Sequence, residues 1–393
     1  MVRVQTVDLP AGGRTWTVLG EDHLPVEVVE EFLEHHRVVG SSPNTVRAYA
    51  KALQLWWVFL HLAGVGWADP GVSTLAGFVT WLRTGELPRV PVLGSRPASA
   101  ALAESTVAVR LAAVVSFYRY QQDAHGRGGA LARASAGAAG SGRYRPFLAH
   151  LPSAARRSPV RLRRARQVRP PLLSPAQVNA ILSGCAVRDP QSGVWSGSLR
   201  NRLLFSVLAE TGMRLGEALC LTHADWHTGR GGTPFVEVVP REHPHGCRVK
   251  GGRCRRIYVS DALERLYSDY LWELADRAAG FGRAVADDWF CFVNLDGEPR
   301  FAAIRPEGVY RVVARLTRSC PQLPAGWTPH WLRHCHATAL LLAGVPPHVV
   351  MRRLGHADIQ TTLNLYGWVT EDAELRAVAD WQRFAEGWRL SDG

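Results

Sequence analysis

The sequence has no apolar run that approaches the ~20 residues needed to cross a bilayer as a helix. Its first twenty residues also lack the apolar segment of a secretory signal, so we expect a cytoplasmic protein without membrane insertion. Acidic residues are few beside basic ones, with 34 Asp and Glu against 46 Lys and Arg, and the formal net charge is +12. This excess favours a polyanionic partner such as nucleic acid, although an Arg-rich protein without such a partner has the same charge.

Cysteine is scarce as well. Seven residues spread over 393 positions form an odd, thin set that does not resemble a disulfide framework, so we expect most of them to be reduced core residues. Hydrophobic residues, in contrast, make up 47% of the chain. That fraction is enough to build real cores, and the length suggests two domains or three.

The pattern along the chain predicts a mainly α fold with a small β-sheet, in which an all-α N-terminal domain precedes an α+β domain. In the first domain we expect four amphipathic helices, one of them capped by Asn44 and ended by Gly64. In the second, Ser174 and Pro175 begin a helix, and residues 233–242, 255–260 and 288–294 read as strands. The expected segments are an arm at 1–20, a helical domain at 21–150, a basic linker at 151–171 and a larger domain at 172–393.

The linker is rich in arginine and proline, and from 156 to 169 it contains no acidic residue. An extended cationic segment between two folded blocks is suited to lie along phosphates, so we expect DNA contact here, with a solvated linker as the plain alternative. The arginines concerned are Arg156, Arg157, Arg161, Arg163, Arg164, Arg166 and Arg169.

Two short segments carry arginines that are suited to bind an anion. In TGMRLGE, Thr211 is expected to cap a helix with Arg214 in its first turn, where Glu217 could hold the guanidinium or simply form an ordinary ion pair. In PHWLRHCHA, His330 and Arg333 share one face near a helix start, where a His and an Arg can bind an anion. Taken alone, the pair could equally be exposed residues on a helix surface. The neighbouring histidines, His334 and His336, are expected to point elsewhere.

Three further residues complete a possible site. His356 follows the helix-breaking Gly355, and Tyr366 lies ten residues later in an apolar pattern that would by itself suggest a core tyrosine. Lys250 stands beside a Gly-Gly pair that predicts a tight hairpin between two strands. Taken together, two arginines can neutralise a phosphodiester, a lysine can protonate a leaving oxygen, and a tyrosine can attack in such a cationic pocket.

At this point the sequence resembles the tyrosine recombinase (phage integrase) family. The resemblance rests on TGMRLGE, KGGRCRRIYV, HWLRH, and LGH followed by the tyrosine, in this order within residues 172–370; residues 21–125 resemble the family's core-binding domain less specifically. It implies a site-specific recombinase that cleaves and rejoins DNA through a 3′-phosphotyrosine, without ATP, metal or other cofactor. It also implies a tetramer on double-stranded DNA that serves integration, excision or transposition of a mobile element.

The resemblance assigns a role to each matching residue. Arg214 and Arg333 would bind the scissile phosphate, and His330 and His356 would donate hydrogen bonds and assist proton transfer. Lys250 would be the general acid and Tyr366 the nucleophile. In support, Glu217 would hold Arg214 in place. A C-terminal helix with Leu375, Val378 and Trp381 on one stripe would dock on a neighbouring subunit or on its own domain.

Some features depart from the family pattern or suit a different function. Arg253 stands where many relatives carry a second lysine, and Cys335 where a small hydroxyl residue is frequent. The segment 240–254 is long and His-rich, so His243, His245, Cys247 and Cys254 could instead bind Zn²⁺ in a metal-dependent nuclease or a zinc-stabilised DNA-binding protein. The ordered motifs would also suit a type IB topoisomerase-like relaxase or a catalytically silent DNA-binding protein.

Overall fold

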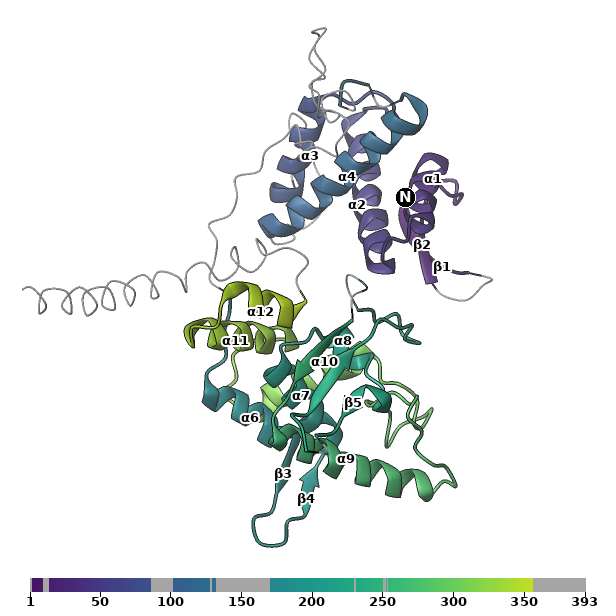
Figure 1. Cartoon of the computed structure of the whole chain (residues 1–393). Coiled ribbons are helices and arrows are strands. Elements are labelled where there is room, and N and C mark those ends of the chain that lie inside the picture. The colour runs from purple at the N-terminus through teal and green to yellow at the C-terminus, as the bar shows by residue number, and fades with distance from the viewer. Residues whose placement is uncertain are drawn as a thin grey trace, which may run out of the picture. The chain divides into compact units, whose positions relative to one another are not determined.

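The computed structural model describes residues 2–9, 14–85, 102–127, 129–131, 170–229, 231–249, 252 and 254–355. The chain forms two compact units, residues 1–166 and 167–393, each with its own core. In its described part the protein is mainly helical with small antiparallel sheets, as the sequence predicts (Figure 1). None of the described helices is long and apolar enough to cross a membrane.

The N-terminal unit is a helical block joined to a hairpin. The sequence suggested that residues 1–20 form only an arm, but this segment contains two strands that pair antiparallel. Val18 of the second strand packs into the helical core. The elements are β1 (Arg3–Asp8), β2 (Arg14–Leu19), α1 (Glu27–Val38), α2 (Pro43–Ala63), α3 (Val72–Thr84) and α4 (Glu104–His125). The four predicted helices are therefore present among the described residues.

Aromatic side chains fill the core of this unit. Trp56 of α2 and Tyr118 of α4 are fully buried, and their polar ends are satisfied because the indole Nε1 donates to the Tyr118 hydroxyl over 3.0 Å. That hydroxyl in turn donates to the carbonyl of Trp67 over 2.8 Å. A buried aromatic with a bonded polar tip fixes the packing of its helix, so α2 and α4 form the rigid centre of the unit.

Local capping decides where α2 begins. The prediction that Asn44 caps this helix was wrong: Ser42 is the N-cap, and its hydroxyl accepts from the backbone N–H of Thr45 over 3.2 Å. Pro43 then occupies the first helical turn, which suits its fixed φ. Gly64 ends the helix in the left-handed conformation, as predicted.

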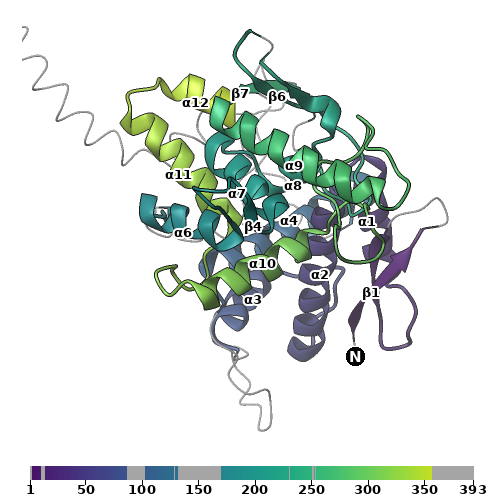
Figure 2. The ribbon, with the colours of Figure 1, turned by 90° about the horizontal axis from the view of Figure 1, so that it is seen from below.

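The C-terminal unit surrounds α7, which contacts α6, α9 and α11 (Figure 2). The first part of this unit contains α6 (Pro175–Cys185), β3 (Ala186–Arg188), β4 (Trp195–Gly197), α7 (Leu199–Thr211) and α8 (Leu215–Leu219). There follow η1 (His223–Asp225), β5 (Trp226–His227), β6 (Phe235–Val238), β7 (Arg255–Tyr258), α9 (Asp261–Ala279), α10 (Pro306–Ser319), α11 (Pro329–Leu342) and α12 (Pro347–Leu354). The predicted helix start at Ser174 and Pro175 is confirmed and carries a full capping box.

Strands β5, β6 and β7 form one antiparallel sheet, with Phe235 opposite Tyr258 and Val236 opposite Ile257. Two predictions about strands differ from what the structure shows. Residues 288–294 form no strand: Phe290 and Val293 make only isolated bridges, although Cys291, Phe292 and Val293 are buried. The connection from β6 to β7 runs from residue 239 to 254, so it is not a tight hairpin.

Candidate active site

Arg214 begins the short helix α8. The expectation that Thr211 caps a helix was wrong, because Thr211 is the last residue of α7 and Gly212 ends that helix in the left-handed conformation. Arg214 is the N-cap of α8 rather than a member of its first turn. A cation at a helix N-terminus opposes the helix dipole, so this position needs a nearby anion.

Glu217 supplies that anion. Its side chain is fully buried, and its carboxylate accepts from Arg214 twice, from Nη1 over 2.8 Å and from the backbone N–H over 3.0 Å. The second oxygen also accepts from Nη2 of Arg255 over 2.7 Å. Burial raises the pKa of this carboxyl, but Arg255 and Arg214 outweigh the effect and hold the pKa below its ordinary value. Glu217 is therefore a buried carboxylate between two arginines.

Arg333 projects from α11 toward the same region. Only 2% of the residue is exposed, and its two Nη atoms donate to the carbonyls of Gly212 and Leu354 over 2.8 and 2.9 Å. Since a guanidinium is planar, two bonds to separate loops fix its plane. Arg333 thereby connects the end of α7 to the end of α12.

The last carbonyls of α12 bring the arginines together. Arg353 O accepts from Nε of Arg255 over 3.0 Å, Leu354 O accepts from Arg333, and Gly355 O lies 3.5 Å from Nη1 of Arg214. A helix C-terminus leaves such carbonyls unpaired and carries partial negative charge, so it attracts cations. Three guanidinium groups, from β7, α11 and the start of α8, thus meet where α12 ends.

The histidines of α11 occupy two different environments. His330 is exposed in the first turn, and its ring meets that of His334 edge-on with centroids 4.5 Å apart. The expectation that His334 points away from this site was therefore wrong. Burial, His330 and Arg333 lower the pKa of His334 to about 4. His336 does point elsewhere, since its Nε2 accepts from Nε of Arg353 over 3.0 Å.

Several predicted site residues lie outside the described residues. Lys250, His356 and Tyr366 are three of these, and their predicted roles stay predictions. The others are the linker arginines, Arg156, Arg157, Arg161, Arg163, Arg164, Arg166 and Arg169, and the stripe residues Leu375, Val378 and Trp381. Among the described site residues, Arg214, Glu217 and Arg333 are brought together around α12, and His330 lies three residues before Arg333 on α11.

The sequence reasoning missed Arg255. Its pairing with Glu217 joins residues 38 positions apart, which spacing along one helix cannot reveal. A signal was present, however: in the strand RRIY, Arg255 alternates with Arg256 and shares a face with the buried Ile257. An arginine on the inward face of a strand requires a buried acid or carbonyl partner.

The residues considered for zinc do not form a ligand set. His243 is buried with its Nδ1 accepting from the backbone N–H of His245, and His245 Nε2 lies 3.1 Å from the carbonyl of Ala303. Cys247 is buried whereas Cys254 is exposed. Within the described ranges, no three His, Cys, Asp or Glu side chains gather as metal ligands. The structure therefore gives no support to the zinc alternative.

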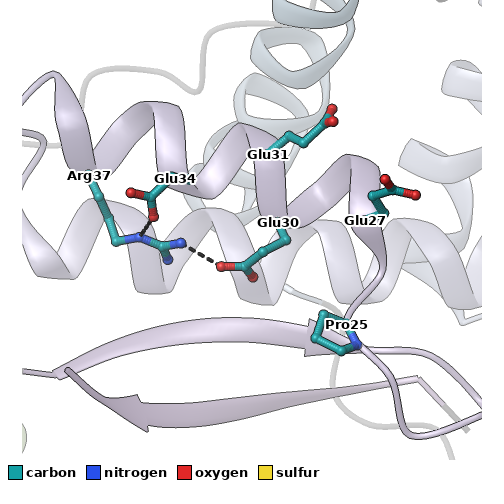
Figure 3. A pocket seen from close by; sticks show the side chains of 6 residues that line it. All are labelled: Pro25, Glu27, Glu30, Glu31, Glu34 and Arg37. Carbon is teal, nitrogen blue, oxygen red and sulfur yellow. Dashed lines mark hydrogen bonds and ion pairs between the residues drawn. The ribbon is translucent and has the colours of Figure 1, made fainter. Parts of the chain in front are cut away.

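A recess of about 480 Å³ on the N-terminal unit lies along α1 and contains none of the candidate residues. Figure 3 shows four glutamates and Arg37 around it, with Arg37 bonded to Glu30 and Glu34 over 2.5 Å each. Four carboxylates against one guanidinium repel phosphate. The recess is consequently not part of a phosphate-binding site.

Comparison with known proteins places both units of the chain in known families. The profile of the phage integrase family matches residues 172–372, and that of the phage integrase N-terminal SAM-like domain matches residues 29–125. Transposase A from transposon Tn554 of Staphylococcus aureus is 29% identical over 353 residues, which cover 89% of this chain and 90% of the transposase. Tyrosine recombinase XerD of Halalkalibacterium halodurans is 31% identical over 214 residues, 54% of this chain and 62% of XerD.

Two solved structures have the same fold. The XerH site-specific recombinase bound to a palindromic difH substrate has a TM-score of 0.57 at 18% identity, covering 90% of this chain and 84% of its own. The Tn1549 transposon integrase in complex with transposon right end DNA has a TM-score of 0.56 at 18% identity, covering 90% and 99%. These matches confirm the predicted fold class. Because the first family profile alone covers more than half of the residues, the chain belongs to the phage integrase family of tyrosine recombinases.

Proposed function

We propose that this enzyme is a site-specific DNA recombinase of a mobile element, and that Tyr366 is its nucleophile. Tyrosine recombinases are DNA strand-transferring enzymes, and double-stranded DNA is the substrate class. The observation that carries the proposal is the meeting of Arg214 and Arg333 at consecutive carbonyls of α12, directly before His356 in the chain. The Tn554 transposase and the Tn1549 integrase support a role in integration, excision or transposition.

The reaction exchanges one phosphodiester for another. The Tyr366 oxygen bonds to phosphorus while the bond from phosphorus to the 5′ oxygen breaks, leaving a 3′-phosphotyrosine and a 5′-hydroxyl. His330 or His356 takes up the proton that the Tyr366 hydroxyl loses, and Lys250 donates the proton that the departing oxygen takes up. Attack by a 5′-hydroxyl reverses the step and releases the tyrosine, so the reaction consumes no ATP.

Charge explains why this chemistry suits the described residues. Negative charge grows on the non-bridging oxygens during phosphoryl transfer, and fixed cations lower that barrier most when they are already in position. Arg214 is oriented by Glu217, and Arg333 by two backbone carbonyls. His330 and His356 add hydrogen-bond donors beside them in our proposal. A tyrosine, whose ordinary pKa is near 10, attacks efficiently only in such a cationic pocket.

The assembly and the wider DNA contacts are also part of this proposal. By the family resemblance, four copies act on two duplexes, and the C-terminal segment with Leu375, Val378 and Trp381 contacts a neighbouring subunit or its own domain. The linker arginines contact DNA phosphates, which agrees with the net charge of +12. Acting on DNA, the enzyme is expected to work in the cytoplasm.

A nicked suicide duplex tests the proposal. Duplexes carrying the DNA beside the coding region trap the adduct, because the short 5′-hydroxyl fragment diffuses away after cleavage. The wild type should form a protein–DNA adduct in EDTA, and Tyr366→Phe should bind the duplex without forming it. An adduct in that variant excludes Tyr366, and strict dependence on a divalent metal would favour a metal-dependent nuclease. Relaxation of supercoiled DNA that carries no recombination site would favour a topoisomerase-like relaxase.

A further inference from the structure

Arg255 contacts two parts of the candidate site at once. Its Nη2 lies 2.7 Å from Glu217 Oε2, and its Nε donates to the carbonyl of Arg353 over 3.0 Å. The side chain is 11% exposed. It therefore joins strand β7, the start of α8 and the end of α12.

Arg255 also packs closely against Gly355. A Cβ built on Gly355 would lie 2.7 Å from Nη1 of Arg255 and 2.9 Å from its Cζ, closer than real Cβ contacts. Gly355 has φ of +67°, a conformation that glycine adopts without strain. The guanidinium of Arg255 thus lies directly against the residue that precedes His356.

Charge balance gives Arg255 a second effect. Without it, the fully buried Glu217 would face Arg214 alone, and this pair would carry no net charge. With Arg255 on the second oxygen, the three side chains keep one net positive charge beside the candidate phosphate site. An ion pair in a poorly hydrated site acts strongly on its neighbours, so this difference matters for binding a developing negative charge.

We propose that Arg255 is a positioning residue of the recombinase: by sharing Glu217 with Arg214 and binding the end of α12, it sets the orientation and effective charge of Arg214 toward the scissile phosphate. This inference rests on the proposed function. Arg255 acts through Glu217 and Arg214 and need not touch the DNA.

Arg255→Met tests the proposal, and Arg256→Met is its matched control. Arg256 is the next residue, has the same charge and lies on the opposite face of β7, where its side chain is 63% exposed near Glu237. The readouts are the single-turnover rate of adduct formation at saturating nicked duplex, the Kd for DNA and the Tm. Arg255→Met should lower the rate roughly 10–100-fold, as loss of a supporting partner does at other preorganised sites, with Kd changed less than about twofold. Arg256→Met should keep the wild-type rate.

A substrate without the phosphate charge separates electrostatics from folding. In a methylphosphonate duplex, one non-bridging oxygen of the scissile phosphate is a methyl group, so less negative charge must be stabilised. The rate defect of Arg255→Met should shrink on this duplex, and Arg255→Lys, which keeps the charge, should show a smaller defect than the Met variant. A purely structural defect would be equal on both duplexes.

The outcomes separate the two proposals. An unchanged single-turnover rate in Arg255→Met, or an equal defect on phosphate and methylphosphonate, overturns the role of Arg255 while the recombinase function stands. If Arg255→Met fails to fold, Arg255→Gln, which is polar but carries no charge, decides, and a wild-type rate in that variant overturns the role. If the wild type itself forms no adduct through Tyr366, the proposed function falls and the role of Arg255 with it.

Discussion

Arg333 donates from Nη2 to the carbonyl of Leu354 over 2.9 Å, and so connects the second turn of α11 to the last residue of α12. The same side chain also satisfies the carbonyl of Gly212. Both bonds are buried, so the side chain supports the local structure as well as the proposed chemistry.

The Arg333→Met variant should therefore be less stable than the wild type and should not cleave DNA. Two buried carbonyls lose their donor, and the free energy of unfolding should fall by about 2–4 kcal/mol in urea titrations. No adduct should form on the nicked duplex. Arg318→Met is the control, because Arg318 is exposed on α10 and donates to its own helix, at Ala314. An Arg333→Met variant as stable as the wild type would show that these bonds contribute little.

Gly355→Ala should disturb the site beyond the strain of its backbone. An alanine at φ of +67° costs roughly 1–2 kcal/mol, and its Cβ would also displace Arg255. Gly344→Ala is the matched control, because Gly344 has φ of +82° with open space around its Cβ position. Both variants should lose similar stability in thermal unfolding. Only Gly355→Ala should also slow adduct formation, and equal rates would contradict the close packing of Gly355 against Arg255.

Because of the buried His336, we expect the free energy of unfolding to depend on pH. Burial and the facing Arg353 lower its pKa to about 4, whereas the unfolded chain returns it to about 6.5. Between these values the unfolded state binds more protons, so the free energy of unfolding falls as the pH is lowered from 6.5 to 4. His336→Gln keeps an acceptor for Arg353 and should make this decline shallower in urea titrations at several pH values. A decline in His336→Gln that is as steep as in the wild type would contradict this role of His336.

If the linker arginines contact DNA phosphates, we expect them to increase the salt dependence of the DNA-binding constant. Each phosphate contact that is removed should lower the slope of log K against log salt by about 0.9 on duplex DNA. Changing the seven arginines between 156 and 169 to Gln should therefore flatten the slope clearly in a fluorescence titration. Arg277 and Arg300 already pair with carboxylates, so changing those two to Gln should leave the slope almost unchanged. A slope that the linker substitutions do not alter would mean that the segment is a solvated connection.

Sequence patterns that span only a few residues correctly predicted where some helices begin and end. Ser174 with Pro175, and Gly64 at the end of α2, lie where their local chemistry places them. Ser42 was missed in favour of Asn44 because both are good caps, and the proline between them decides the position. Residues 288–294 were read as a strand because an apolar run marks burial without revealing whether a partner strand lies beside it.

The site itself was only partly visible in the sequence. The Arg214–Glu217 pair follows from helical spacing and is present. The contacts of Arg255 depend on how separate elements pack, which a single sequence does not encode in any short pattern. The contact of His334 with His330 has the i, i+4 spacing of neighbours on one helix face, so it could have been predicted. The ordered motifs of the family, rather than local propensity, were what identified the candidate residues together.

The contacts of Gly355 limit how far the proposed nucleophile, Tyr366, can reach. The carbonyls of residues 353–355 all meet guanidinium groups of the C-terminal unit, so Gly355 is held at a fixed point in that unit. Tyr366 follows eleven residues later, and eleven fully extended residues span at most about 36–40 Å. Under our proposal, any phosphate that Tyr366 attacks, whether beside its own subunit or beside a neighbour, must lie within that backbone distance of Gly355 plus the length of the tyrosine side chain.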